Sequence, residues 1–163
     1  MKQQDKVKDP VCGMWVAKHD HEASYQQMPF AFCSDQCRTR FLAYPHLYIG
    51  YPGAAAPKQE GKVVFKRRRL HLQQALSVEG EVIIDRMLRD LMGVTSVTVA
   101  GDSIEITYDL LQVSLKELEA ALVEAGAQFG EGWAARLRRA LINTSEETEI
   151  EASEVTSPHH YRP

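Results

Sequence analysis

All three cysteines of this 163-residue chain, Cys12, Cys33 and Cys37, lie in its first quarter. An odd number of cysteines does not suit a disulfide framework, and clustered cysteines in a reducing compartment more often bind metal. A segment of about forty residues usually needs a staple such as a bound metal to fold. The alternative is three buried, inert cysteines that act as small apolar side chains. The cluster predicts a metal-binding module over residues 9–50, with the three cysteines as thiolate ligands.

The residues around the first two cysteines predict turns. Pro10 fixes φ, and Gly13 permits a tight turn directly after Cys12. A backbone loop can therefore present one sulfur at this position. Residues 25–32 predict a short β-hairpin whose second strand ends at Cys33.

The third cysteine lies at a predicted helix start. Ser34 is a good N-cap for a helix over residues 35–43, which places Cys37 in the first turn. The positive end of the helix dipole favours a thiolate there. The module has few apolar residues for a core, and we expect it to contain Phe41, Leu42, Leu47 and Tyr48.

Three thiolates predict one soft or borderline ion, Cu(I) or Zn(II). Structural zinc takes four protein ligands. A fourth would have to be Met14, His19, His21, an outside ligand or water. Cu(I) is satisfied by three sulfurs, or by two sulfurs and a thioether, so the count favours Cu(I). Solvent exposure is the alternative for both histidines, because they lie in a polar run.

Residues 63–130 predict a second domain. Alternating apolar residues predict strands around residues 70–72, 94–99 and 104–108, and a turn at 101–102 joins the last two. A final short strand is expected around Gln128. With the two helices described below, the order is βαββαβ, the ferredoxin-like pattern. The predicted fold class is α+β, a small treble-clef-like module plus a ferredoxin-like domain.

Both helices of this second domain have periodic apolar residues. In the first, residues 79–92, the predicted inward stripe is Val82, Ile83, Met87, Leu88 and Leu91. Ser114 and Glu117 predict a capping box for the second helix, which stops at Gly126. The predicted inward residues of that second helix are Leu115, Leu118, Leu122 and Val123.

The remaining segments predict connections and ends. Residues 51–62 contain prolines and no periodicity, which predicts a linker. Residues 131–143 predict a helix with Trp133, Leu137, Leu141 and Ile142 on one side and Arg136, Arg138 and Arg139 on the other. Residues 144–163 are rich in Glu, Ser and Thr, which predicts a disordered tail.

Residues 9–48 resemble a known family. The run from Asp9 to Met14, with Phe32 to Cys37, Phe41, Pro45 and Tyr48, resembles the YHS domain, a relative of the TRASH metal-binding modules. The resemblance implies a treble-clef-like finger that binds or senses metal without catalysis. Modules of this family occur beside heavy-metal transport ATPases, mercury and copper handling proteins and metal sensors, so the resemblance implies a role in metal handling.

The second domain resembles the heavy-metal-associated domain of copper chaperones and copper-pumping ATPases. The resemblance is carried by Leu70-x-Leu72, Gly93-Val94, residues 104–109 and residues 118–126. That family binds metal through a Cys-x-x-Cys pair between the first strand and the first helix. Here those positions fall on Ser77 and Gly80, so we expect this second metal site to be absent.

A basic run starts the second domain. Lys66, Arg67, Arg68 and Arg69 could face an acidic partner or an anionic membrane surface. A solvated edge that resists aggregation is the alternative. The expected partners are a heavy-metal P-type ATPase or another metal-transport protein, or a second copy in a homodimer. The net charge of −3 argues against nucleic acid.

The sequence predicts a heavy-metal accessory, chaperone or sensor protein, with Cu(I) favoured. A zinc-stabilised adaptor that docks or dimerises through its second domain is the alternative. The Cys-x-x-x-Cys spacing differs from thioredoxin-like sites, and we expect no enzyme. The polar start and the lack of a run of about 20 apolar residues predict a cytoplasmic protein without a transmembrane segment.

Overall fold

The computed structural model describes residues 5–130 and 132–155. The chain has a mixed α/β architecture and divides into two compact units at Lys62/Val63. Of the described residues, 5–62 and 151–155 belong to the first unit and 63–150 to the second. None of the helices in these ranges is long and apolar enough to cross a membrane.

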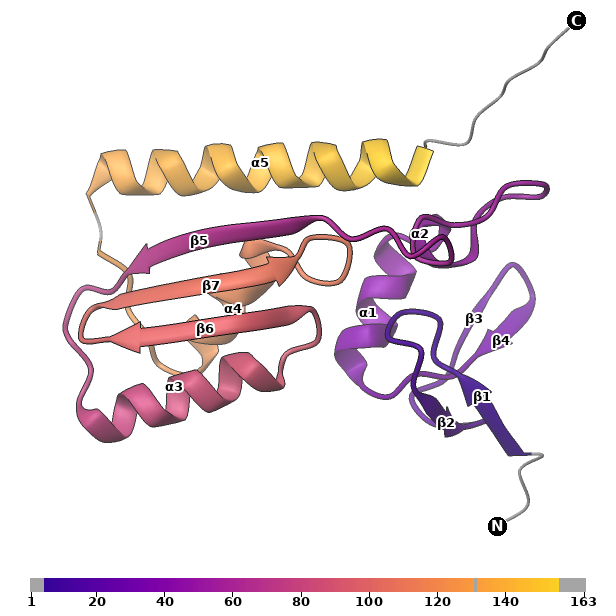
Figure 1. Cartoon of the computed structure of the whole chain (residues 1–163), viewed down its shortest axis with the longest axis horizontal. Helices are drawn as coiled ribbons and strands as arrows, with labels where there is room; N and C mark the ends of the chain where they lie inside the picture. The colour runs from indigo at the N-terminus through magenta and orange to yellow at the C-terminus, as the bar shows by residue number, and fades with distance from the viewer. Residues whose placement is uncertain (1–4, 131, 156–163) are drawn as a thin grey trace, which may run out of the picture. The chain divides into compact units, whose positions relative to one another are not determined.

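The first unit consists of two small antiparallel sheets and two short helices (Figure 1). The bounds are β1 Lys6–Lys8, β2 Trp15–Ala17, β3 Ala23–Tyr25, β4 Met28–Phe30, α1 Asp35–Ala43 and α2 His46–Ile49. Strands β1 and β2 pair with each other, and β3 pairs with β4. The turn of the β3–β4 hairpin has positive φ at Gln26 and Gln27, as a type I′ turn requires. The predicted hairpin is therefore present, but its second strand ends at Phe30, before Cys33.

An aromatic cluster around Phe41 forms the core of the first unit. The ring centroid of Phe41 lies 4.7 Å from that of Phe30, 5.2 Å from Phe32 and 6.3 Å from Tyr48. Of the four predicted core residues, Phe41, Leu47 and Tyr48 are fully buried. The prediction for Leu42 is wrong: its side chain is exposed, because the next residue along a helix points about 100° away from Phe41.

Residues 51–62 pack within the first unit and are held by hydrogen bonds. Tyr51 and Ala54 form a β-bridge, Ala56 is fully buried, and the Lys58 N–H donates to the Leu47 carbonyl at 3.1 Å. Gly50 has φ +64°, and a Cβ there would lie 2.3 Å from the Ala54 carbonyl oxygen. Only glycine fits this turn, which brings the segment back onto the unit.

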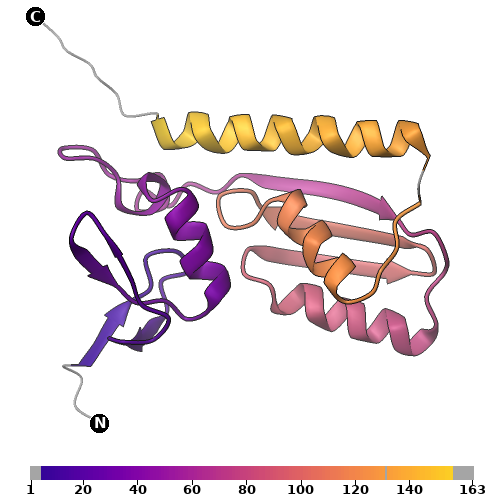
Figure 2. The same cartoon turned by 180° about the vertical axis from the view of Figure 1, so that it is seen from behind.

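The second unit is built on a three-stranded antiparallel sheet in the order β5-β7-β6. The bounds are β5 Phe65–His71, α3 Val78–Asp90, β6 Val94–Ala100, β7 Ser103–Asp109 and α4 Leu115–Glu124. Burial alternates along β7, with Ile104, Ile106 and Tyr108 fully buried. Figure 2 shows α4 lying across the sheet. The expected last strand is reduced to a single bridge between Leu72 and Phe129.

The two predicted helices of this unit are present, but their buried faces differ from the prediction. The predicted stripe of α3 is wrong for Val82 and Ile83, which are 57% and 63% exposed, whereas Ile84 and Leu88 are buried. Helix α3 therefore has apolar residues on its exposed side as well as on its buried side. The capping box of Ser114 and Glu117 is present, and Leu115, Leu118 and Leu122 are buried. Val123 is exposed, contrary to prediction.

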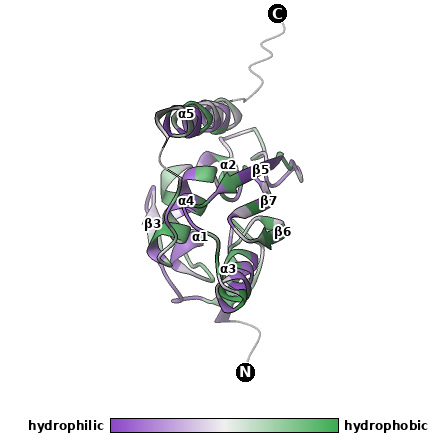
Figure 3. Cartoon of the chain, turned by 90° about the vertical axis from the view of Figure 1, so that its left-hand side faces the viewer, coloured by the Kyte–Doolittle hydropathy of each residue, from purple (hydrophilic) through white to green (hydrophobic). Residues whose placement is uncertain are grey.

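Helix α5, Trp133–Val155, is longer than predicted. Residues 144–155, expected in a disordered tail, continue the helix, and residues 156–163 lie outside the described residues. The predicted apolar face is also wrong, because Leu137 and Leu141 are 50% and 63% exposed. Figure 3 shows that α5 mixes hydrophilic and hydrophobic residues along its length.

Buried polar contacts hold the middle of α5 within the second unit. Glu146 is 2% exposed and accepts hydrogen bonds from the Tyr108 hydroxyl at 2.7 Å and the Leu115 N–H at 2.9 Å. Its carboxylate also pairs with the Arg68 guanidinium at 3.1 Å. Burial, followed by the nearby Glu146 carboxylate, raises the pKa of Tyr108 far above its usual value. The hydroxyl therefore stays protonated and remains a donor to Glu146.

Candidate metal centre

Three separate pieces of the first unit carry the three cysteines. Cys12 lies in the turn between β1 and β2, Cys33 follows β4, and Cys37 is in the first turn of α1. The Ser34 side chain caps α1 by accepting a hydrogen bond from the Cys37 N–H at 3.3 Å. The predicted bounds and N-cap of this helix are thereby confirmed.

The three sulfur atoms converge on one point. Cys33 Sγ lies 3.5 Å from Cys12 Sγ and 3.3 Å from Cys37 Sγ, and all three cysteines are free. Three sulfurs around one tetrahedral Zn²⁺, at about 2.3 Å each, would be about 3.8 Å apart. The cluster is slightly tighter than that, so small outward movements of the sulfurs would accommodate an ion. The residues therefore fit a thiolate metal site.

Asp9 is the site residue that the sequence analysis missed. It is 1% exposed, and one of its oxygens lies within 4.8 Å of all three sulfurs. Its Oδ1 accepts hydrogen bonds from the N–H groups of Val11 at 2.8 Å and Cys12 at 3.4 Å, and its Oδ2 accepts one from the Cys33 N–H at 2.8 Å. Asp9 thus ties the first cysteine loop to the second. An Asp that accepts from the N–H two residues on is a local turn signal, but the bond to Cys33 is not local.

Burial and hydrogen bonding shift the pKa values of Asp9, Cys12 and Cys37. Burial alone would raise the pKa of Asp9, but the N–H groups of Cys33 and Val11 outweigh it, and the pKa is lowered. Burial raises the pKa of Cys12 to about 12, with a further contribution from Cys33. Burial also raises the pKa of Cys37 strongly. A bound cation would reverse this preference for neutral thiols, so metal binding must release protons.

The two predicted histidine ligands are not gathered with the cysteines. His19 is paired with Glu22 at 3.0 Å, and His21 is paired with Asp35 at 3.1 Å. Neither belongs to the potential metal-binding group of Asp9 and the three cysteines. Met14 is 58% exposed. A role for its thioether stays a prediction.

The basic run of β5 is paired within the second unit. Lys66 contacts Glu149 at 2.7 Å, while Arg67 and Arg69 both contact Glu105 on β7. Together with the Arg68–Glu146 pair, these contacts lower the net charge that the run presents. Docking through this run stays a prediction.

The two positions that would carry sulfur in a heavy-metal-associated domain form a helix cap. Ser77 is the N-cap of α3, and its hydroxyl accepts a hydrogen bond from the Gly80 N–H at 3.1 Å. Within the described residues, the group in the first unit is the only cluster of three or more Cys, His, Asp or Glu side chains placed to hold a metal.

The segment that carries the three cysteines is similar to a known family. Residues 7–51 match the family model of the YHS domain. No curated protein matches the chain. Among solved structures, the crystal structure of oxidized MerP from Ralstonia metallidurans CH34 is similar at 17% identity, with a TM-score of 0.39. The match covers 41% of this chain and 96% of that chain.

Proposed function

We propose that the chain binds one soft or borderline heavy-metal ion through Cys12, Cys33 and Cys37, and that it handles this ion without catalysis. The observation that carries the proposal is the convergence of three free sulfurs from three separate segments. The match of residues 7–51 to the YHS domain supports it independently.

Cu(I) is the proposed ion. Cu(I) suits soft sulfur ligands and is satisfied by three of them. Asp9 is the remaining potential ligand in the cluster, and its oxygens already accept three backbone hydrogen bonds. Cys12 and Cys33 are half-buried, which leaves the sulfurs accessible enough for an ion to enter and leave. An accessible three-sulfur site fits transfer or sensing better than permanent storage.

The proposed context is a heavy-metal transport system in the cytoplasm. The β-α-β-β-α order of β5 to α4 supports a ferredoxin-like second domain, although its metal-binding cysteines are replaced by Ser77 and Gly80. Such a domain would recognise a metal-transporting ATPase, another transport protein or a second copy of the chain, and would leave metal binding to the first unit.

A titration with Cu(I) against a chromophoric competing chelator tests the proposal. We expect tight binding of one ion per chain. Changing Cys12, Cys33 or Cys37 singly to Ser should weaken it by about a thousandfold, because each thiolate supplies about a third of the binding free energy. Met14→Leu tests the thioether, and an affinity within about twofold of wild type would show that three sulfurs are sufficient. Equal, weak binding by wild type and all cysteine variants would refute the proposal.

A zinc-stabilised adaptor is the second candidate, and the position of Asp9 favours it. Three sulfurs and one carboxylate oxygen would complete the four ligands that structural zinc takes. X-ray absorption of protein purified without added metal separates the two functions. Zinc with four ligands that does not exchange for Cu(I) supports the adaptor, whereas copper with sulfur ligands alone supports metal handling.

A further inference from the structure

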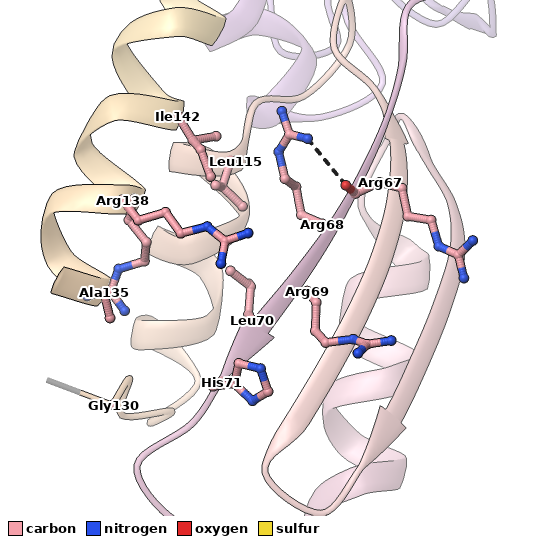
Figure 4. A pocket seen from close by; sticks show the side chains of 11 residues that line it. Arg67, Arg68, Arg69, Leu70, His71, Leu115, Gly130, Ala135, Arg138 and Ile142 are labelled. Carbon is pink, nitrogen blue, oxygen red and sulfur yellow. Dashed lines mark hydrogen bonds between the residues drawn. The ribbon is translucent and has the colours of Figure 1, made fainter. Parts of the chain in front are cut away.

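The second unit contains a cavity of about 520 Å³ between β5 and the first half of α5 (Figure 4). Its apolar lining includes Leu70, Leu115 and Ile142. Its charged lining includes Arg68, Arg138 and Arg139. A cavity of this size accommodates a small organic molecule.

The side chains of β5 alternate between the cavity and the opposite side of the strand. Figure 4 shows the Arg67 and Arg69 side chains directed away from the cavity, and both pair with Glu105. Arg68 lies between them and faces the cavity side, where it pairs with Glu146. Arg67 and Arg69 also line the cavity, but Arg68 is the arginine of this strand whose guanidinium lies on the cavity side.

Arg68 has an unused donor. Its Nη2 contacts Glu146 at 3.1 Å, and its Nη1 donates to the Arg67 carbonyl at 3.3 Å. Its Nε is buried and has no hydrogen-bond partner among the described residues. A buried donor without a partner is costly, so a movement of the Arg68 side chain that brought this nitrogen to an acceptor in the cavity would be favoured.

The positive charge of the cavity is not fully compensated. Glu146 pairs with Arg68, and Glu119 lies 3.5 Å from Arg139, whose guanidinium also stacks 4.8 Å from the Phe129 ring. Arg138 has no ion pair or hydrogen bond within the described part of the chain. Among the described residues, the five arginines that line the cavity are paired with only Glu105, Glu146 and Glu119, which leaves positive charge in excess.

We propose that this cavity binds a small organic monocarboxylate with an apolar body. Arg138 and the free Nε of Arg68 would hold the carboxylate, for which guanidinium groups are well shaped. Leu70, Leu115 and Ile142 would contact the apolar body. The excess positive charge favours an anion, and inorganic phosphate would leave the apolar lining without a partner. The proposal does not depend on metal binding, since no cysteine lies in the second unit.

Isothermal titration of the full chain with octanoate tests the proposal, with octanamide and inorganic phosphate as comparison probes. We expect saturable octanoate binding and about tenfold weaker binding of octanamide, which lacks the charge. Phosphate should also bind at least about tenfold more weakly, because it buries no apolar surface. The same titration with Cys33→Ser should give unchanged octanoate binding even if the metal site is lost. Absence of saturable binding, or equal affinity for octanoate and either comparison probe, would overturn the proposal.

Two arginine variants locate the site. Arg138→Gln removes the unpaired guanidinium and should weaken octanoate binding about tenfold. Arg86→Gln removes the same charge from an exposed position on α3 that does not line the cavity, and it should change the affinity by less than about twofold. Arg68→Lys keeps a charge beside Glu146 but lacks the Nε donor, and it should also weaken binding provided that circular dichroism shows an unchanged fold. Equal losses in the Arg138 and Arg86 variants would show attraction to surface charge and refute the site.

Discussion

The two units of this chain differ in the interactions that can stabilise their folds. The first has short strands, two small helices and an aromatic cluster around Phe41, and its three cysteines and Asp9 meet in one place. The second has a three-stranded sheet with a continuous buried face through Ile104, Ile106 and Tyr108. From this comparison we expect a bound metal to stabilise the first unit, whereas apolar packing stabilises the second.

The difference extends to the use of charge. In the first unit, buried Asp9 faces backbone N–H groups and thiols, an arrangement that a cation would complete. In the second, buried Glu146 already has its cation in Arg68 and further donors in Tyr108 and Leu115. One buried carboxylate therefore belongs to the candidate metal centre, and the other joins a helix to a sheet.

Metal removal should separate the two units most clearly. Structural metal sites in small modules contribute on the order of 10 kcal/mol to folding, so a strong chelator should unfold the first unit. Hydrogen exchange followed by mass spectrometry should then show faster exchange in α1, residues 35–43, with unchanged protection in β7, residues 103–109. Retained protection of α1 in metal-free protein would contradict this division of stability.

Glu146→Gln should be the most damaging of the point variants in the second unit. Removing one charge of a buried pair leaves Arg68 uncompensated and costs about 3 kcal/mol. Glu147→Gln is the matched control, because Glu147 pairs with the exposed Lys116 at the surface and should cost less than about 1 kcal/mol. Urea denaturation measures both. Equal effects of the two variants would show that the Glu146 network does not stabilise the second unit.

Asp9→Asn should affect metal binding in the first unit and leave the second unit unchanged. The amide replaces one acceptor oxygen by a donor that faces backbone N–H groups, so the two cysteine loops lose their link. Outer-shell partners of this kind typically contribute about 10–100-fold to metal affinity. Asp20→Asn, at an exposed carboxylate that accepts from the Ala17 N–H, is the control. Unchanged Cu(I) affinity of the Asp9 variant would show that Asp9 does not position the cysteines for metal binding.

The double variant Ser77→Cys with Gly80→Cys should give the second unit a metal site of its own, with a small loss of folding stability. A Cβ at Gly80 would lie 3.4 Å from Ser77 Oγ, an ordinary contact, and loss of the Ser77 cap costs about 1 kcal/mol. Thiolates at a helix N-terminus are favoured, so we expect a second Cu(I) ion per chain. Stoichiometry from metal analysis decides this, and binding of only one ion would show that the second unit lacks more than the two sulfurs.

Local features were predictable because they depend on neighbours in the sequence. The Ser34 N-cap, the bounds of α1, the capping box of Ser114 and Glu117, and the β6–β7 hairpin follow from propensity, caps and period-two alternation. The order of elements in the second unit was predicted for the same reason. Clustering also identified the cysteines as one group before their distances were known.

The buried side of each helix and the long-range polar contacts were not predictable in this way. Helix α3 has apolar residues on more than one side, and only its packing selects Ile84 and Leu88 over Val82 and Ile83. The sequence by itself determined where the cysteines are and which positions of the second domain lack them, since residue type alone decides that chemistry. The tertiary structure alone decided the role of Asp9, because its partner Cys33 is distant in sequence. It also decided the length of α5, because Glu146 in this helix pairs with Arg68, which is distant in sequence.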